Sequence, residues 1–283
     1  MRSILKIFIF FATAMILMVY CVYDSFNLAP SRFMIRYESL ENPRIPEQMD
    51  GISILFFSDL EYGTFMDEER FARFVDMVNI AAPDIVVFGG DLYDENALVT
   101  EESNVAVTSL LKSINAPLGK FAVLGDNDHA SEEKTESIRQ TLLAADFELL
   151  ENKVANLRNK GSQGIVLVGL DSEYKGSLDI DTAYSSVSRT TYTITVCHTP
   201  DTADRVPADI TDYFLAGHSH GGQAYFYFMS FYTPSHATKY LRGKHEVNNF
   251  ILDITNGVGT SWEDVRFLAG AEAVMYRLHH VNY

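Results

Sequence analysis

Five short polar segments hold residues whose types suit metal binding. Each contains aspartate, glutamate or histidine and follows an apolar run; they cover residues 58–61, 89–94, 124–129, 197–201 and 217–223. Carboxylate oxygens and imidazole nitrogens are the ligands that divalent metals use in catalytic sites. A metal held by such groups lowers the pKa of a bound water and can drive hydrolysis.

The spacing within these segments indicates that they converge. Ligands of α/β sheets gather at the carboxyl ends of the strands, so segments far apart in sequence can meet there. In an extended stretch, residues two apart point the same way, which places Asp59 with Glu61 and His218 with His220. The sequence therefore predicts one metal site that is assembled from several strand ends.

Strands and helices alternate along the chain, which predicts an α/β fold. The helical face of Phe71, Phe74, Val75 and Val78 marks one helix, and two more are expected at 100–114 and 133–144. Strands are expected at 52–57, 84–88, 121–124, 164–169, 191–196, 212–216, 250–254 and 273–279. The second half is richer in strand. No repeat or linker divides the chain after about residue 50, so residues 31–283 are expected to form one domain.

Residues 1–30 are expected to form a cytoplasmic stub and a membrane anchor. Segment 7–23 holds no charge and as a helix would reach about 25 Å, near the thickness of a bilayer core. The alternative is a cleaved signal peptide, but no small-x-small cleavage site follows the apolar run. Arg2 and Lys6 precede the segment and Asp24 follows it, which predicts a single-pass protein of the cell membrane with its soluble domain outside.

The charge composition limits the kinds of molecule that the chain is expected to bind. The chain has 38 acidic and 22 basic side chains and a net charge of -16, which disfavours nucleic acid. A small phosphate ester remains compatible, because metals supply positive charge locally. Cys197 is the only cysteine outside the apolar segment, so no disulfide forms within the soluble domain. The aromatic residues of the segment 225–240 could form a buried hairpin, a substrate wall or a membrane-facing surface, and burial is expected for most of Phe226, Tyr227, Phe228, Phe231 and Tyr232.

In order and content, the polar segments resemble the motifs of the calcineurin-like metallophosphoesterases: D-x-H, G-D-x-x-D, G-N-H-D/E, H and G-H-x-H. The resemblance spans roughly residues 50–283. More closely, the chain is similar to the membrane-anchored branch that ends in G-H-T-H-G-G-Q, here at 217–223 with Ser219 in place of Thr. The resemblance implies a four-layer α-β-β-α sandwich with an N-terminal transmembrane helix and two metals above the strand ends.

The resemblance also implies a set of seven metal ligands. Asp91 would bridge two ions, Asp59 and His220 would hold the first, and His198 and His218 would hold the second. With the residues that stand at the variant positions, the ligand set is Asp59, Glu61, Asp91, Asp126, His198, His218 and His220. Mn or Fe is favoured over Zn or Mg as the metal.

Three positions depart from the family pattern. Glu61 replaces a histidine ligand, Asp126 replaces an asparagine ligand, and Asn127 replaces the histidine that protonates the leaving group. A glutamate ligand favours oxygen-preferring cations such as Mn, Mg and Fe. With two divalent ions and a hydroxide, four carboxylates bring the charge of the site to about -1 instead of about +1. A trivalent iron, a retained proton or a single metal would each change that balance.

The absence of the acid histidine at position 127 should also slow hydrolysis, because proton donation to the leaving group accelerates such a reaction ~10² to 10⁴-fold. His129, two residues beyond Asn127, is the nearest replacement, and the alternative for His129 is a solvated loop residue or a helix cap. Asn127 is expected to donate to a phosphoryl oxygen, and Asp94 is expected to have a structural or supporting role.

The resulting hypothesis is a phosphodiesterase that acts near the membrane on a phosphoester, such as a lipid or glycolipid head group. Two metals about 3.5 to 4 Å apart would activate a bridging hydroxide. Two alternatives remain open: a metal-binding or sensing protein that has lost turnover, and a membrane protein that binds Ca²⁺ for stability. The oligomeric state is not predicted.

Overall fold

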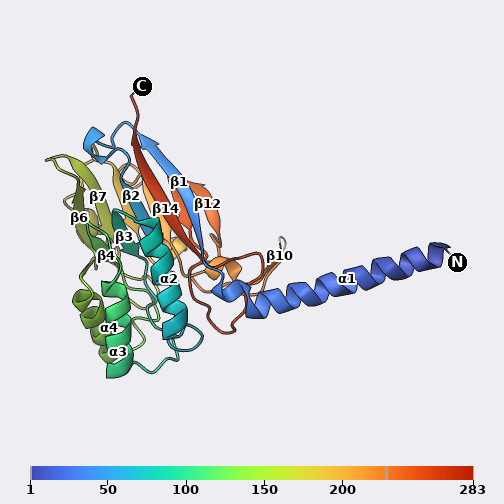
Figure 1. Cartoon of the computed structure of the whole chain (residues 1–283). Helices are drawn as coiled ribbons and strands as arrows, with labels where there is room; N and C mark the ends of the chain where they lie inside the picture. Colours follow the sequence, from blue (N-terminus) through green and yellow to red (C-terminus); the bar gives the residue numbers. More distant parts are fainter. Residues whose placement is uncertain (1, 227–228, 283) are drawn as a thin grey trace.

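The structure is a computed structural model, and it describes residues 2–226 and 229–282. Helix α1 (Arg2–Asn27) projects away from a domain that is built on two six-stranded sheets (Figure 1). Over its length α1 is apolar enough to cross a membrane, and it has none of its apolar window buried against the domain.

The first sheet has the strand order β1-β14-β2-β3-β4-β5. Its strands are β1 (Met34–Asn42), β14 (Glu272–His280), β2 (Ser53–Phe57), β3 (Ile85–Phe88), β4 (Lys120–Ala122) and β5 (Phe147–Leu149). Strands β2 to β5 are parallel, whereas β14 runs antiparallel to β2 and pairs in parallel with β1. The carboxyl ends of β2, β3 and β4 therefore lie at one edge.

The second sheet has the order β12-β13-β9-β8-β7-β6. Its strands are β12 (Gly243–Val247), β13 (Phe250–Ile254), β9 (Tyr213–Ala216), β8 (Thr193–Val196), β7 (Gly164–Gly169) and β6 (Lys153–Arg158). Strands β7, β8, β9 and β13 are parallel. This sheet supplies the second set of strand ends that the site requires.

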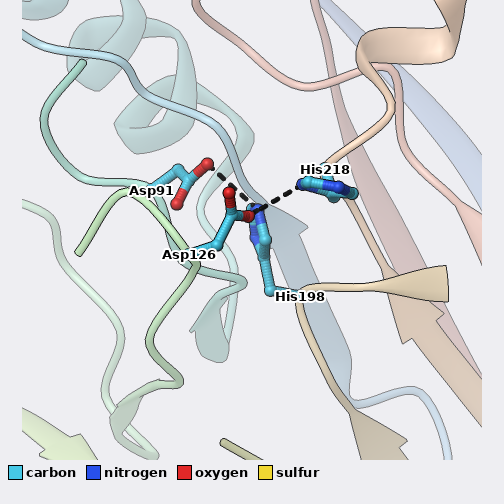
Figure 2. A group of neighbouring side chains, drawn as sticks. All are labelled: Asp91, Asp126, His198 and His218. Atoms are coloured by element: carbon cyan, nitrogen blue, oxygen red, sulfur yellow. Dashed lines mark ion pairs between the residues drawn. The ribbon is translucent and has the colours of Figure 1, made fainter. Parts of the chain in front are cut away.

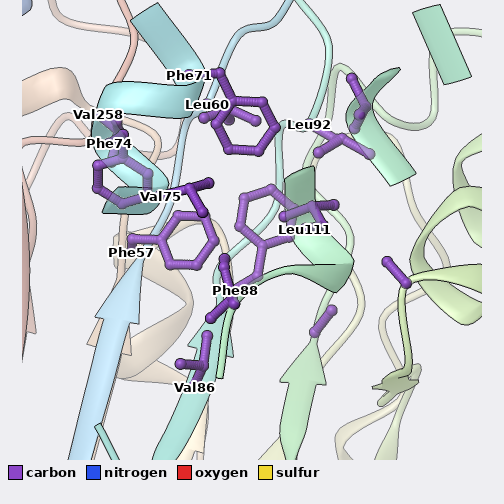
Figure 3. Packing of buried hydrophobic residues seen from close by; sticks show 14 of the residues in the cluster. Phe57, Leu60, Phe71, Phe74, Val75, Val86, Phe88, Leu92, Leu111 and Val258 are labelled. Carbon is purple, nitrogen blue, oxygen red and sulfur yellow. The ribbon is translucent and has the colours of Figure 1, made fainter. Parts of the chain in front are cut away.

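Three helices cover the outer face of the first sheet: α2 (Glu68–Ala81), α3 (Glu101–Lys112) and α4 (Glu132–Ala144). Leu55 and Phe57 of β2 face these helices, and Phe57 packs on Phe74 of α2 with ring centroids 5.1 Å apart (Figure 3). The period of two along a strand sends Ile54 and Phe56 to the opposite face.

Ile54 and Phe56 pack between the two sheets, against Leu167 of β7 and Leu215 of β9. The outer face of the second sheet carries a third apolar cluster, which the short helix α5 (Ile180–Tyr184) and the 3-10 helix η3 (Pro200–Asp204) cover. The molecule is thus a four-layer α-β-β-α sandwich, as expected. Its second helical layer is thin, which agrees with the strand-rich second half of the sequence.

Several parts of the chain differ from expectation, among them strands β5, β6 and β12, which were not among the expected strands. Strand β1 was not predicted, because it is a largely exposed edge strand without a regular apolar alternation. The predicted burial of the aromatic segment is wrong for Phe226 and Phe231, which are exposed beside the short strands β10 (Tyr225–Phe226) and β11 (Met229–Ser230). Tyr232 is partly buried, and Tyr227 and Phe228 lie outside the described residues.

Candidate metal centre

All seven predicted ligands are buried in loops that follow parallel strands of the two sheets. The loop after β2 carries Asp59 and Glu61, and those after β3 and β4 carry Asp91 and Asp126. The loop after β8 carries His198, and the loop after β9 carries His218 and His220. The structure brings these side chains together in two groups, each with ligand atoms within 4.8 Å of one another.

The first group, called here the histidine-rich cluster, consists of Asp91, Asp126, His198 and His218. The Nε2 atom of His198 lies 3.0 Å from Asp91 Oδ2 and 3.2 Å from Asp126 Oδ1 (Figure 2). The Nδ1 atom of His218 lies 2.9 Å from the same Asp126 oxygen. Two imidazoles and two carboxylates therefore point at one small volume.

The second group, called here the carboxylate-rich cluster, consists of Asp59, Glu61 and His220. The Nε2 atom of His220 lies 3.6 Å from Asp59 Oδ1 and 3.5 Å from Glu61 Oε1. The two clusters adjoin, because Asp59 Oδ1 is also 3.8 Å from His198 Nε2. A pair of cations held by the two clusters would be close neighbours.

The backbone at the ligands is unusual. Asp59, Glu61, Asp91, His218 and His220 all have φ between 49° and 68°, in the left-handed region that non-glycine residues seldom adopt. Such conformations cost about 1 to 3 kcal/mol each and persist at functional sites where the surroundings impose them.

The ligand side chains are closely packed by the neighbouring loops. A Cβ atom on Gly125 would lie 2.1 Å from Asp91 Oδ1, and one on Gly217 would lie 2.5 Å from Asp59 Oδ2. Glycine is required at both positions, since any side chain would displace a ligand.

Backbone carbonyls orient the imidazoles of the histidine-rich cluster. His198 Nδ1 lies 2.8 Å from Gly89 O, and His218 Nε2 lies 2.7 Å from Ser235 O. A metal-bound histidine commonly donates its other ring N–H to a carbonyl or carboxylate, which turns the free nitrogen toward the metal. Among the described residues, the buried atoms Asp126 Oδ1, His198 Nε2 and His220 Nδ1 have no hydrogen-bond partner. These features fit a metal site.

The electrostatics of the side chains lead to the same conclusion. Burial raises the pKa of Asp91 to about 7, although His198 opposes this shift. Burial and the charges of Asp91 and Asp59 raise the pKa of Glu61 well above its usual range. Burial also lowers the pKa of His220 to about 4, which keeps it neutral and able to bind a cation. Cations between these carboxylates would offset their repulsion.

Asp126 and the two histidines beside it form a charged network. Burial opposes ionisation of Asp126, yet the neighbouring imidazoles of His198 and His218 hold its pKa well below the usual range. Burial disfavours the charged form of His198, but Asp91 and Asp126 raise its pKa well above that of a free histidine. A metal at this cluster would displace a proton, because it binds the deprotonated imidazole.

Two of the positions that depart from the family pattern contact each other. The amide Nδ2 of Asn127 donates to Glu61, at 3.2 Å from Oε1 and 3.3 Å from Oε2. The backbone N–H of Asn127 donates to Asp91 Oδ1 at 2.8 Å. Asn127 therefore orients one carboxylate from each cluster.

Asp128 is a supporting residue to which the sequence assigned no role. Its carboxylate accepts backbone N–H bonds from Asp91 and Leu92 at 2.9 Å and from Gly125 at 2.8 Å, so it ties two ligand loops together. The sequence feature that could have identified Asp128 is its position two residues after the ligand Asp126. Asp94 accepts from Thr64 Oγ1 and from Asn96 N and has a structural place outside both clusters.

His129 is not placed with the ligands. Its Nε2 atom lies 2.6 Å from Asp171 Oδ1, and it lines a separate cavity of about 490 Å³. The hydrogen bond and charge of Asp171 outweigh burial and raise the pKa of His129. The role of His129 as the acid stays a prediction.

A cavity of about 210 Å³ lies over the two clusters. The cavity is lined by predicted site residues, namely Glu61, Asp91, Asp126, Asn127, His218 and His220. Its lining also includes four residues that the sequence did not single out as site residues: Glu95, Tyr174, Lys175 and Ser261. Tyr232 completes the wall beside His220, with ring centroids 5.7 Å apart. A larger hollow of about 830 Å³ between α3 and α4 contains no residue of either metal cluster.

Residues 52–222 match the family described as calcineurin-like phosphoesterase, and the chain belongs to this metal-dependent family. It is 27% identical to the uncharacterized metallophosphoesterase YkuE of Bacillus subtilis, over 90% of this chain and 88% of that protein. It is 26% identical to a bovine (Bos taurus) transmembrane protein with a metallophosphoesterase domain, over 64% of this chain and 43% of that protein.

One solved structure is also similar in part. The calcineurin-like phosphoesterase YfkN from Bacillus subtilis superposes with a TM-score of 0.43 at 14% sequence identity, covering 73% of this chain and 81% of that one. The assignment of the fold rests on the two sheets and their helical layers described above.

Proposed function

We propose that this protein is a metal-dependent phosphoester hydrolase, specifically a phosphodiesterase that acts at a membrane. The observation that carries the proposal is the pair of adjoining, buried ligand clusters beneath one cavity. Membership of the calcineurin-like phosphoesterase family supports the reaction class.

The seven ligands divide between two ions in the proposal. Asp59, Glu61 and His220 would hold one ion, Asp126, His198 and His218 would hold the other, and Asp91 would bridge them. When bound, the ions would supply Lewis acidity at the phosphoryl group and a water of lowered pKa. The four carboxylates favour Mn or Fe. Asn127 would keep the Glu61 carboxylate directed into its cluster.

Lys175 is the cation that we assign to substrate binding. It lines the cavity, where its Nζ atom lies 2.9 Å from Glu95 Oε1 and 5.4 Å from the centroid of the Tyr174 ring. The extra carboxylates of this site weaken its attraction for a phosphate anion, and Lys175 would offset this by turning from Glu95 to the phosphate. Lys175→Met should raise KM ~3- to 10-fold with little change in kcat, as loss of uniform binding does.

The substrate that we propose is a phosphodiester in a lipid or glycolipid head group. The support is helix α1, which is long and apolar enough to tether the domain to a bilayer. Arg2 and Lys6 precede the apolar segment 7–23 within α1, which favours a domain on the outer side of the cell membrane.

Metal content and turnover test the proposal together. The full chain in nanodiscs should contain two metal ions by elemental analysis and should hydrolyse bis(p-nitrophenyl) phosphate with Mn²⁺ in a chelator-sensitive reaction. Asp91→Ala should remove bound metal and activity together, whereas the control Asp76→Ala, at an exposed position on α2, should keep both. Activity that survives Asp91→Ala would refute the assignment, and bound metal without turnover would favour the sensing protein.

A further inference from the structure

We propose that an exposed apolar face beside the metal cavity rests in the head-group region of the bilayer that α1 enters. This interfacial face consists of five side chains that are between 37% and 64% exposed: Phe226, Met229, Phe231, Trp262 and Leu268. Large apolar groups that gather on a surface mark contact with a partner or a membrane. The docking itself does not depend on the proposed hydrolysis.

Contacts between two segments make the face continuous. The N–H of Tyr225 donates to Phe267 O at 2.9 Å, so strand β10 lies along the segment that carries Leu268. The Phe226 ring packs on Phe267 at 4.7 Å and on Phe231 at 5.5 Å between centroids. The N–H of Phe267 donates to Gln223 O at 3.0 Å, and the side chain of Gln223 donates to Ser261 O at 2.8 Å, next to Trp262.

The end of α1 places this face at the membrane surface. The N–H of Arg266 donates to Ser25 O at 2.9 Å. Ser25 follows the end of the apolar segment 7–23 by two residues, which is a rise of about 3 Å along a helix. Figure 1 shows β10 on the side of the domain from which α1 leaves. Arg266, in the loop between Trp262 and Leu268, is therefore held within about one helical turn of the hydrocarbon core.

Residue chemistry favours the head-group region over the hydrocarbon core. Tryptophan and other aromatic side chains concentrate where acyl chains meet water. Arg242 lies 4.3 Å from the centroid of the Tyr225 ring and donates to Leu268 O at 3.0 Å, which puts a cation beside the face. Such a cation suits anionic lipid phosphates. Glu263 is exposed next to Trp262, so this edge has to remain hydrated.

The face also adjoins the cavity. Tyr232 follows Phe231, Ser261 precedes Trp262, and both Tyr232 and Ser261 line the cavity over the metal clusters. Docking of the interfacial face would thus place the cavity next to the lipid head groups. Only this consequence for the substrate rests on the proposed function.

Trp262 provides a direct test, because it is the only tryptophan in the chain. The full chain is reconstituted in phosphatidylcholine–phosphatidylglycerol vesicles, with and without acyl chains brominated near the head group. We expect bromine to quench Trp262 fluorescence, and the lipid to protect it from acrylamide.

Matched variants sharpen the test. Met229→Ser with Phe231→Ser should reduce bromine quenching ~2-fold or more, since the two changes remove apolar area that the head-group region would bury. The control Val105→Ser with Leu143→Ser changes side chains that are 65% and 52% exposed on α3 and α4, and it should leave quenching unchanged.

Three outcomes would overturn the proposal. These are free access of acrylamide without bromine quenching, equal loss of quenching in the control, and protection from acrylamide without bromine quenching. The last would mean that a second copy of the chain covers the face. None of these measurements involves turnover, so their failure would leave the proposed hydrolase standing.

Discussion

The two ligand clusters differ in what holds them. In the histidine-rich cluster, the main-chain carbonyls of Gly89 and Ser235 fix the two imidazoles. In the carboxylate-rich cluster, Glu61 is oriented by a side chain, the amide of Asn127, and His220 Nδ1 has no hydrogen-bond partner within the described residues. Both imidazoles of one cluster are thus tied to the backbone, whereas Glu61 in the other cluster owes its orientation to a side chain.

The clusters also differ in ligand chemistry. Equal numbers of imidazoles and carboxylates suit several divalent metals, whereas two carboxylates and one imidazole favour harder, oxygen-preferring cations. We therefore expect the two positions to differ in metal preference and in sensitivity to mutation.

The largest effect should come from the histidine-rich cluster. His198→Ala removes the imidazole beside Asp91, Asp126 and Asp59 and leaves buried carboxylates without a partner. Removing one partner of a buried ion pair costs roughly 3 to 5 kcal/mol. Thermal unfolding without added metal should show this loss, and elemental analysis should show that both ions are absent.

Glu61→Gln is the matched change in the other cluster, because glutamine keeps the shape and can still accept from Asn127. It should weaken only one of two Mn²⁺ sites, by ~10- to 100-fold in a titration. If the two variants lost metal equally, the contrast between the clusters would be wrong.

The next largest effect is expected from changing Glu61 and Asn127, the two variant residues that contact each other. Glu61→His with Asn127→His returns both positions to the family pattern and removes one negative charge. The variant should bind Zn²⁺ relatively better, and it should gain up to ~10² in kcat on alkyl phosphodiesters, whose leaving groups need a proton. Rates on bis(p-nitrophenyl) phosphate should change little. Glu61→His alone is the control, and an equal gain from it would show that the added acid does nothing.

The smallest effect should come from His129. Because the Asp171 pair raises the pKa of His129, the pair stabilises the fold fully below pH 6.5, and this contribution is lost as pH rises through the raised pKa. His129→Gln keeps an N–H donor but does not titrate. The stability difference between wild type and variant, from urea unfolding without added metal, should therefore shrink from pH 6 to pH 9; a difference independent of pH would contradict the assigned ion pair.

The same variant tests the catalytic role of His129. If His129 supplies the proton, His129→Gln should slow the hydrolysis of alkyl esters far more than that of p-nitrophenyl esters. Equal rates on both substrates would leave His129 as a structural partner of Asp171.

Local sequence was enough to predict the strands whose ends carry the site. The apolar runs before Asp59, Asp91, Asp126, His198 and His218 predicted strands, and a strand end needs only nearby residues to be recognised. The residue types then indicated a metal centre, since aspartate, glutamate and histidine at the ends of successive strands have few roles in common other than metal binding. The four-layer fold came from the family resemblance, and the alternating sides of β2 show its physical basis: Leu55 faces helices and Ile54 faces the other sheet.

Other features were decided only by tertiary packing. Asn127 meets Glu61 across 66 residues of sequence, and His129 meets Asp171 across 42. The exposure of Phe226 and Phe231 likewise depends on how the hairpin lies against the loop that contains Phe267. Contacts of this kind follow from how the sheets, loops and α1 come together, and no local pattern encodes that arrangement. The sequence thus determined which groups could bind metal, and the folded chain decided which side chains orient them and which apolar side chains stay exposed near the end of α1.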